Sequence, residues 1–426
     1  MTEKKKIKLL LIVADHAGIG SIRFVWPGQE MINKFSDQFD VELNITPDYN
    51  DIEYFKQFDI IHFHRQFGDI DKVKSTFKIL QDNGTIMVMD LDDNFDIQKS
   101  HPFYAMAVKE DIATKTKKLL TLVNAVTSTT HLFQKFLKQY NQNVIIMKNG
   151  IDPAHWKDEN TQLLNDNRLR IGYAGGSSHH EDLKLIKDSM TALHNDKELI
   201  GKYQIVMCGY DVRGQMNMVD DKGNIINSRK MLPSESIWNR FEEILTDNYN
   251  PNIISPEYQK WLKRYKNEPY PFGDIRQEFY IKRWTLPLSS YPTHYNHFDV
   301  SLAPLVDNSF NLMKSELKIS EAGMKKKVIV AQDFGIYKDI IRDGENGFLV
   351  NYKDKLGWYK ILKKLILNRE LVNKVSNTLY EEVKDIYTME NLTKIRVQEY
   401  LKMIEKRDAK FTENNTIEES VVSSNV

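Results

Sequence analysis

Short apolar runs alternate along the first 150 residues with longer segments in which apolar residues recur every three or four positions. The apolar runs predict six strands, at 7–14, 41–45, 58–63, 85–89, 125–128 and 144–147. The segments between them predict helices, of which 29–39 and 72–82 show the clearest periodicity. Strands that alternate with helices form parallel sheets through right-handed crossovers. The first half is therefore predicted to be a doubly wound α/β domain.

The same alternation begins again in the second half of the chain. It predicts strands at 169–174, 203–208, 299–303 and 327–331, and helices at 181–195 and 315–323. Pro153 and a polar run interrupt the periodicity over 152–167. The predicted fold class is α/β with two Rossmann-like halves, an N-terminal domain of residues 1–155 and a C-terminal domain of residues 165–385.

Two segments depart from this alternation. Residues 211–296 are about twice as long as a connection between strands requires, and they are interpreted as an insertion with a hairpin at 219–227 and helical pieces around Trp238 and Trp261. The last residues, 410–426, are polar and are predicted to be disordered.

Composition narrows the classes of protein that fit. Hydrophobic residues make up 41% of the 426 residues, enough to fill two cores. The 59 Lys and Arg balance the 59 Asp and Glu, so no bulk attraction to nucleic acid or anionic membrane follows, although a local basic patch is compatible with this balance. The single cysteine, Cys208, excludes a disulfide framework and a thiolate metal cluster. The first residues have too few apolar positions for a signal peptide or a membrane span, so a soluble, cytoplasmic protein is expected.

The first candidate for chemistry is the loop after the first predicted strand, with Gly18, Gly20 and Arg23. Glycines between a strand and a helix let the backbone approach a ligand, and a helix start attracts anions. A dinucleotide fingerprint requires a third glycine where Arg23 stands, so that interpretation fails. Arg23 is suited to a phosphate, and the alternative is a tight turn without a ligand.

A second candidate follows the strand at 85–89, where three acids occur in the run Asp90-Leu91-Asp92-Asp93. Ligands of open α/β sheets bind beyond the carboxyl ends of strands. The acids therefore suggest a divalent metal site or a base, and the alternative is a helix cap or a pair with a lysine. His62 and His64 alternate along the preceding strand, so one of them is expected to face the site.

In the second half, Gly175, Gly176 and Ser177 form the counterpart of the first loop, followed by His179 and His180. Small residues before a helix suit a pyrophosphate, although Gly-Gly turns are common in α/β units.

The densest pattern spans 303–323. Lys314, Lys318 and Glu321 have the spacing of one helical face, which suits a nucleotide diphosphate: ammonium groups for phosphates and a carboxylate for ribose hydroxyls. The alternative is a solvated, salt-bridged surface helix.

These motifs together resemble a family. The order LAPL, DN, FN, KS, K and EAG within 302–323, followed by DGENGFLV at 343–350, resembles the donor half of retaining GT-B glycosyltransferases of the "glycosyl transferases group 1" type. The loop at 18–23, the DLDD run with His101-Pro102, and the NGID segment at 149–152 extend this resemblance less specifically.

The resemblance implies two Rossmann-like domains that face each other across a cleft, with the sugar nucleotide held by the second. A final helix, 386–408, is expected to complete the first domain. Glu321 matches the second Glu of the family's Glu-x7-Glu motif, expected on the ribose, while Met313 stands where the first Glu is expected. Lys314 or Asn311 is then expected to take over nearby.

The resemblance also implies roles for the remaining candidates. The donor-binding set is Gly175, Gly176, Ser177, Asn311, Lys314, Ser315, Lys318 and Glu321. The catalytic set is Asp93, Asp92, Lys318 and Arg23, in which Asp93 orients or deprotonates the acceptor hydroxyl. The acceptor side is Gly18, Gly20, Arg23 and His64. No metal or other cofactor is expected, and no protein nucleophile.

The predicted function is transfer of a hexosyl group, with retention, from a nucleotide-diphosphate sugar, with a UDP-sugar favoured over a GDP-sugar. The acceptor stays open between a glycan, a lipid, a small molecule, a protein and DNA. One alternative is a DNA-modifying glycosyltransferase acting on hydroxylated bases, with the cations of 211–296 holding the polymer. Another is a non-catalytic sugar-nucleotide or glycan-binding module, which Met313 favours.

Overall fold

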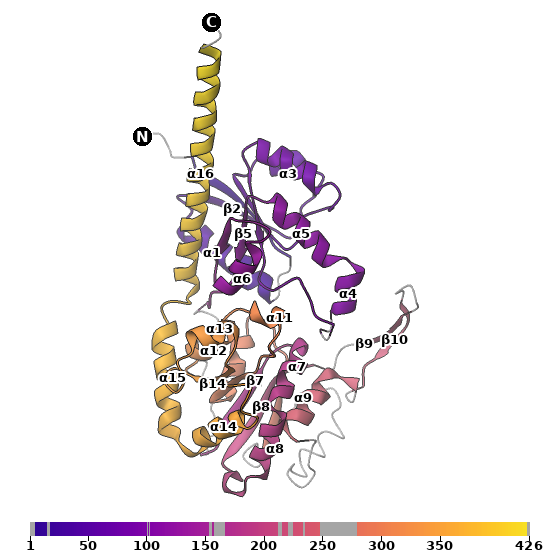
Figure 1. Cartoon of the computed structure of the whole chain (residues 1–426), viewed down its shortest axis with the longest axis vertical. Helices are drawn as coiled ribbons and strands as arrows, with labels where there is room; N and C mark the ends of the chain where they lie inside the picture. Colours follow the sequence, from indigo (N-terminus) through magenta and orange to yellow (C-terminus); the bar gives the residue numbers. More distant parts are fainter. Residues whose placement is uncertain are drawn as a thin grey trace. The chain divides into compact units, whose positions relative to one another are not determined.

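The computed structural model describes residues 5–14, 18–99, 101, 103–152, 156, 167–211, 215–219, 225–232, 235–247 and 279–423. The chain forms two compact units (Figure 1). Unit 1 comprises Met1–Pro153, Leu312–Ser315 and Asp385–Val426, and unit 2 comprises Ala154–Asn311 and Glu316–Lys384. Each unit contains one parallel six-stranded sheet covered by helices, so the predicted α/β class with two Rossmann-like halves is confirmed.

The sheet of unit 1 has the strand order β2-β1-β3-β4-β5-β6. Its strands are β1 (Ile7–Ile12), β2 (Phe39–Asn44), β3 (Ile60–His64), β4 (Ile86–Asp90), β5 (Ala125–Ser128) and β6 (Val144–Ile146). Its helices are η1 (Ser21–Val25), α1 (Trp26–Lys34), α2 (Ile52–Phe55), α3 (Val73–Asp82), α4 (Tyr104–Lys109), α5 (Ile112–Leu122), α6 (His131–Leu137) and α16 (Met389–Ser423). All six predicted strands are present, with small shifts at their ends.

Alternate residues of each strand build two separate cores in unit 1. Leu9 and Leu11 pack on one face with Met31 of α1 and Tyr400 of α16. Leu10 and Ile12 point to the other face, toward α3, α5 and α6. A strand buried on both faces needs apolar residues at every position, which is why the run at 7–14 reads as continuous rather than alternating.

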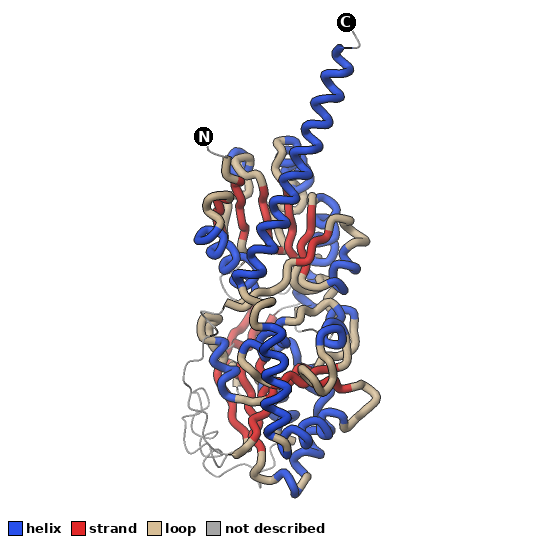
Figure 2. Tube along the Cα trace, turned by 90° about the vertical axis from the view of Figure 1, so that its left-hand side faces the viewer, coloured by secondary structure: helices blue, strands red, loops and turns tan. Residues whose placement is uncertain are grey.

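Helix α16 is longer than the sequence predicts. Its backbone continues through Ser423 and extends past the sheet of unit 1 (Figures 1 and 2), where disorder was predicted for 410–426. The segment from Met389 to Ser423 contains neither glycine nor proline, so nothing in it breaks a helix once the first turns have packed. Among the described helices, this one included, none has a stretch apolar enough to cross a bilayer.

The sheet of unit 2 has the order β11-β8-β7-β12-β13-β14. Its strands are β7 (Leu169–Ala174), β8 (Tyr203–Tyr210), β11 (Tyr280–Trp284), β12 (Val300–Ala303), β13 (Val328–Gln332) and β14 (Phe348–Val350). Its helices are η2 (Ser177–His179), α7 (His180–Leu183), η3 (Lys184–Ile186), α8 (Lys187–Asn195), η4 (Lys197–Leu199), α9 (Ile237–Leu245), η6 (Tyr291–His297), α11 (Ser309–Leu312, ending in unit 1), α12 (Leu317–Met324), α13 (Gly335–Ile340), α14 (Gly357–Leu367) and α15 (Arg369–Val383).

The segment at 211–296 is only partly an insertion. It contains an antiparallel hairpin, β9 (Gln215–Val219) with β10 (Ile225–Lys230), and the helix around Trp238, as predicted. However, its strand β11 joins the main sheet beside β8. The sequence pattern hides β11 because Lys282 and Arg283 interrupt its apolar run. Residues 220–224 of the predicted hairpin and the piece around Trp261 lie outside the described residues.

In unit 2, the strand order places the loops that follow β7 and β12 side by side, at the carboxyl ends of adjacent strands. β7 pairs with β8 on one side and with β12 on the other, so the chain leaves the carboxyl ends of β7 and β12 in diverging directions. Ligands of open parallel sheets bind at such a switch point. The loop with Gly175 follows β7, and the loop leading to α12 follows β12.

Candidate functional site

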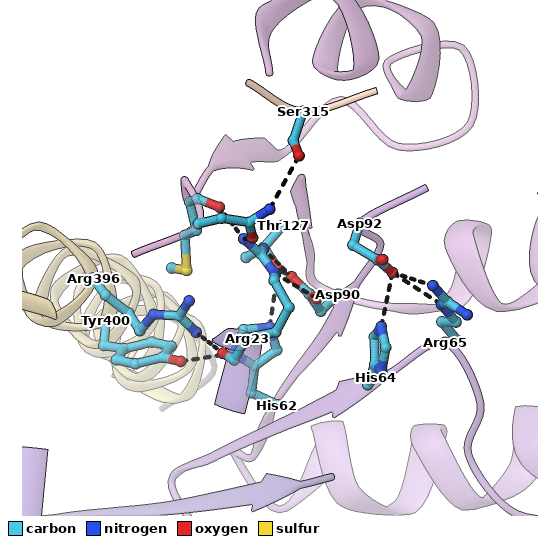
Figure 3. A network of polar contacts seen from close by, with 12 residues as sticks. Arg23, His62, His64, Arg65, Asp90, Asp92, Thr127, Ser315, Arg396 and Tyr400 are labelled. Atoms are coloured by element: carbon cyan, nitrogen blue, oxygen red, sulfur yellow. Dashed lines mark hydrogen bonds and ion pairs between the residues drawn. The ribbon is translucent and has the colours of Figure 1, made fainter. Parts of the chain in front are cut away.

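Arg23 lies in η1, a short π-helical turn that opens directly into α1. Its side chain is fully buried, and Figure 3 shows it among the residues that it binds. The guanidinium donates from Nε to Asp90 Oδ2 over 3.0 Å, makes a second bond to Asp90 Oδ1, and also binds the Met147 carbonyl and Asn149 Oδ1. The role predicted for Arg23 as a direct phosphate ligand is therefore corrected: its donors are taken up by the protein itself.

Asp90 is the buried partner that makes this arrangement stable. Burial alone would raise the pKa of its carboxyl, but the charge and hydrogen bonds of Arg23 outweigh burial and lower the pKa to about 2. Thr127 also donates to Asp90 Oδ1 over 2.5 Å. Asp90 is thus an ionised residue with a structural role. The candidates for chemistry in this run are therefore Asp92 and Asp93.

The same network reaches α16 through His62. The imidazole bonds Thr127 Oγ1 at 3.0 Å and the Tyr400 hydroxyl at 2.7 Å, and Arg396 donates to the Arg23 carbonyl over 2.8 Å (Figure 3). Burial lowers the pKa of His62 to about 3, so the ring is neutral. The helix that returns to unit 1 therefore completes its polar core.

Asp92 lies at the carboxyl edge of the same sheet and accepts three hydrogen bonds on one oxygen. His64 Nε2 lies 2.9 Å from Asp92 Oδ1, and Arg65 approaches the same atom with Nε at 3.0 Å and Nη2 at 2.5 Å. Burial would raise the pKa of Asp92, but the hydrogen bond from His64 and the charge of Arg65 hold it well below its usual range. Of the two predicted histidines, His64 is the one beside the acids.

Asp93 is the most open of the three acids, with a side chain 36% exposed. Lys314 Nζ lies 3.4 Å from its Oδ1. Lys314 belongs to the segment Leu312–Ser315, which packs in unit 1: Met313 is 7% exposed in the cluster around Leu91 and Phe133, and Ser315 Oγ accepts from Asn149 over 3.2 Å.

This placement corrects the helical face predicted for Lys314, Lys318 and Glu321. Helix α12 begins only at Leu317, so Lys314 precedes it and pairs with Asp93, while Lys318 and Glu321 lie on the helix in unit 2. The physical reason is the burial of the apolar residue Met313. It packs in a core of unit 1, and the segment that contains it is therefore not part of α12. Ser315, predicted to bind the donor, is likewise an Asn149 partner in unit 1.

The glycines of the first loop differ in conformation. Gly18 has φ +53°, in the left-handed region where a glycine is favoured, and nothing lies within 4 Å of the place a Cβ would take. Gly20 is helical and immediately precedes η1. Of these two glycines, only Gly18 thus adopts a backbone conformation that favours glycine.

In unit 2, the loop after β7 and helix α12 come together. Lys318 donates from Nζ to the carbonyl of Ala174, the last residue of β7. A Cβ at Gly175 would lie 2.6 Å from the Tyr173 hydroxyl, so any other residue there would force the buried Tyr173 ring to shift. Gly176 and Ser177 follow as exposed residues. The ammonium of Lys318 therefore lies against the base of the exposed glycine loop, and its role toward a phosphate group stays a prediction.

Asp182 fastens this loop to the segment after β12, and the sequence interpretation missed it. Its Oδ2 lies 2.7 Å from His179 Nδ1, and its Oδ1 accepts from Asn311 Nδ2 and from the Val306 backbone N–H, both over 2.8 Å. Asn311, predicted to bind the donor, is 5% exposed. Its side chain connects the segment after β12 to Asp182. The His179–Asp182 spacing of three residues on a helix was the available signal.

Glu321 points into unit 2 rather than to solvent, with 4% of its surface exposed. Its Oε2 accepts from the Tyr295 hydroxyl over 2.7 Å and from the Tyr291 hydroxyl over 3.3 Å. Burial raises the pKa of Glu321, while Lys318 and the two tyrosines act in the opposite direction. The sequence interpretation did not include these tyrosines. The available signal was two tyrosines four residues apart, shortly before the predicted strand at 299–303.

The cations of 211–296 that the structure describes differ in exposure. Arg229 binds Glu235 with both terminal nitrogens in an exposed pair, whereas Lys282 lies 2.9 Å from Glu242 in a buried pair. Lys230 and Arg240 are exposed and Arg283 is half-buried, so a role of these cations in holding a polymer stays a prediction. The other cations predicted for that role, Arg213, Lys260, Lys263, Arg264 and Arg276, lie outside the described residues. Within the described part of the chain, no three His, Cys, Asp or Glu side chains gather as a metal site.

Comparison with solved structures identifies the architecture. The chain is similar to Anabaena HepE in complex with UDP and glucose (10% identity, TM-score 0.57, covering 93% of this chain and 100% of that one). It is equally similar to sucrose-phosphate synthase from Thermosynechococcus elongatus (10%, 0.57, 94% and 100%) and to a glycosyltransferase from Rickettsia africae (12%, 0.57, 95% and 100%). The fold is that of GT-B glycosyltransferases. No protein-family model and no curated protein sequence matches the chain.

Proposed function

We propose that this chain is a glycosyltransferase that moves a hexosyl group from a nucleotide-diphosphate sugar to an acceptor hydroxyl with retention of configuration, and that a UDP-sugar is the donor. One observation carries the proposal. At the switch point of unit 2, an ammonium group (Lys318) and a carboxylate (Glu321) lie one helical turn apart beside an exposed glycine loop. The complexes of HepE with UDP and with UDP-glucose support the nucleotide.

The chemistry asks for charge stabilisation more than for covalent help. The bond between the sugar carbon and the diphosphate breaks while the acceptor oxygen bonds to that carbon on the same face. Negative charge grows on the departing phosphate, so a preorganised cation there lowers the barrier. Lys318 is held against the Ala174 carbonyl and is assigned to this phosphate. No metal ion is assigned a role, because the protein supplies the cation.

On the acceptor side, Asp93 is assigned to the acceptor hydroxyl. It is the exposed member of the acidic run, and the two other acids, Asp90 and Asp92, are occupied by arginines. An ionised carboxylate that accepts the hydroxyl proton raises the nucleophilicity of the attacking oxygen. Asp92 and His64 act behind it as positioning residues.

Nucleotide binding tests the donor site. In a thermal-shift panel, UDP or a UDP-sugar is expected to raise the melting temperature of the wild type, because ligand at about 100 times Kd stabilises by about 2.7 kcal/mol. Glu321→Ala and Lys318→Ala should abolish most of the shift. Lys338→Ala, which removes an exposed lysine of α13, is the matched control and should keep it. Equal shifts in all four proteins would contradict the site.

A second measurement tests Asp93. Release of UDP from UDP-glucose, with water or a hydroxylated acceptor, is expected to fall about 10²–10⁴-fold in Asp93→Asn, because a base is lost while the donor site is intact. The UDP thermal shift should be unchanged. Asp96→Asn, an exposed acid three residues further along the same loop, should react at the wild-type rate. Full activity in Asp93→Asn would remove the residue from the mechanism.

A further inference from the structure

Arg65 directly follows strand β3 in a backbone conformation that favours glycine. Its φ is +61°, in the left-handed region. Two hydrogen bonds hold this turn: the Arg65 N–H donates to the Asp90 carbonyl over 3.1 Å, and the Gln66 N–H donates to the His64 carbonyl over 2.7 Å. An arginine in this conformation costs free energy that a glycine would not. Its side chain is therefore expected to contribute something that a glycine cannot.

The guanidinium of Arg65 is held along one edge. Nε and Nη2 both donate to Asp92 Oδ1, over 3.0 Å and 2.5 Å, and Figure 3 shows Arg65 at the end of the polar network, beyond Asp92. Burial alone would lower the pKa of Arg65, but the charges of the neighbouring acids, Asp92 first among them, raise it, so the group is a cation. Because the guanidinium is planar and one edge is fixed, the direction of its remaining donors is set.

The other end of this guanidinium is open. An arginine has five N–H donors, of which Arg65 uses two on Asp92. Nη1 has no hydrogen-bond partner among the described residues, and the side chain is 44% exposed. Arg23, the other arginine of this network, bonds with all three of its nitrogens inside the protein and has no exposed surface. Arg23 is thus structural, whereas Arg65 keeps donors for a molecule from outside.

The open end of Arg65 determines which chemical group it can bind. Nη1 and Nη2 donate side by side, and their spacing matches two oxygens of a phosphate or a carboxylate. The acids beside it have other partners: Asp92 also accepts from His64, and Asp93 lies 3.4 Å from the ammonium of Lys314. These partners lessen the repulsion that the two carboxylates exert on an anion. A neutral hydroxyl would use one donor only, so the geometry favours an oxyanion.

We propose that the acceptor carries a phosphate or carboxylate group, and that Arg65 binds this group and thereby selects anionic over neutral acceptors. The inference rests on the proposed function, because Asp93 is assigned there to the acceptor hydroxyl. Asp93 follows Asp92 directly in the chain, so one small molecule can reach both groups, with its oxyanion on Arg65 and a hydroxyl on Asp93. Arg65 is then a specificity-determining residue that the sequence interpretation did not include.

The test compares three probes that differ in charge: glucose 6-phosphate, glucuronate and glucose. Their affinities for the full chain are measured by calorimetry at equal ionic strength, with saturating UDP present to occupy the proposed donor site. The wild type is expected to bind at least one of the two anions about tenfold to a hundredfold more tightly than glucose, the range for hydrogen bonds to a charged group. The two anions distinguish a phosphate from a carboxylate.

Arg65→Gly is the decisive variant, because glycine keeps the left-handed turn and removes only the side chain. It should bind the anions no more tightly than glucose. Arg65→Lys retains a charge but cannot donate to two oxygens in parallel, so it should lose most of the preference. Two variants are used so that misfolding of one leaves the other informative. Lys326→Gly is the matched control, since Lys326 is an exposed cation of unit 2 with φ +50°, and it should keep the full preference.

The outcomes separate the inference from the proposed function. A wild type that binds none of the probes, or all three equally, would overturn the inference. A folded Arg65→Gly that keeps the preference would overturn it too, as would variants that weaken all three probes alike, because that result indicates a structural role only. In each case, binding of UDP measured by itself leaves the proposed function standing. Failure of UDP to bind the wild type would overturn the proposed function itself.

Discussion

Arg23→Ala is expected to destabilise unit 1 by about 3–5 kcal/mol, because it leaves the Asp90 carboxylate charged and unpaired in a core from which water is excluded. Both side chains have no exposed surface, and the same guanidinium also binds the Met147 carbonyl and Asn149. Hydrogen exchange of the β1 and β4 amides reports on this unit alone. Their protection should fall by about a hundredfold or more.

Lys78→Ala is the control for this measurement, since Lys78 pairs with Asp82 on an exposed helix surface of the same unit. Exposed pairs of this kind contribute little, so the exchange of β1 and β4 should not change. Unchanged protection in Arg23→Ala would show that the buried pair does not stabilise the sheet, and would reopen the phosphate role for this residue.

The pair also carries a pH dependence with a fixed sign. The pKa of Asp90 falls from an ordinary value of 3.8 to about 2 in the folded chain. A depressed carboxyl pKa stabilises the fold fully above the unfolded value and loses this contribution as pH falls toward the folded value. Wild-type unit 1 should therefore lose stability between about pH 4 and pH 2. Arg23→Ala, without the pair, should lose less over that interval.

The sheets could be predicted from sequence because most of their strands, such as β4 and β13, are buried on both faces. Strands of this kind appear as short apolar runs, such as 86–89 and 328–331, and the helices between them show regular periodicity. Strand β11 escaped because it is an edge strand with Lys282 and Arg283 in its middle, where the apolar requirement is relaxed. The fold thus followed from burial, and the errors occur where burial is partial.

The candidate site was predictable only as far as residue type and loop position determine it. The glycine loop with Lys318 lies where the pattern placed it, because both motifs leave adjacent strands at the switch point. Arg23 and Asp90 were misjudged because a charged residue in a loop normally faces water, and only the fold reveals that the two neutralise each other. Sequence spacing contains no information about partners 67 residues apart.

The motif at 303–323 is divided between the two units, which the sequence pattern also did not predict. Read as one helix, Lys314, Lys318 and Glu321 share a face, but the burial of Met313 in unit 1 ends that regularity. Position 313 is where the resemblance expects a glutamate. A methionine there gives up a carboxylate and gains an apolar anchor, and Lys314 beside it pairs with Asp93. The departure from the family pattern thus has a structural consequence that the alignment of motifs alone does not show.

Lys318→Ala is expected to slow release of UDP from UDP-glucose by about 10²–10³-fold, the range for removing one preorganised group that stabilises developing charge. The side chain donates to the Ala174 carbonyl at the end of β7, beside Gly175 and Gly176, so it lies where a diphosphate would meet the loop. Because Lys318 is also expected to bind the diphosphate in the ground state, UDP affinity should fall as well, and the additional fall in kcat reports the charge that grows on the phosphate as the bond to the sugar breaks.

Three outcomes of this experiment are distinguishable. Lys338→Ala, on the exposed side of α13, should react at the wild-type rate, which shows that the loss is not a general effect of removing a lysine. A Lys318→Ala variant that loses UDP affinity and keeps kcat would make this residue a ground-state binder, because uniform binding changes KM alone. A variant with both parameters unchanged would place the leaving group elsewhere, and the switch point of unit 2 would lose its assignment as the donor site.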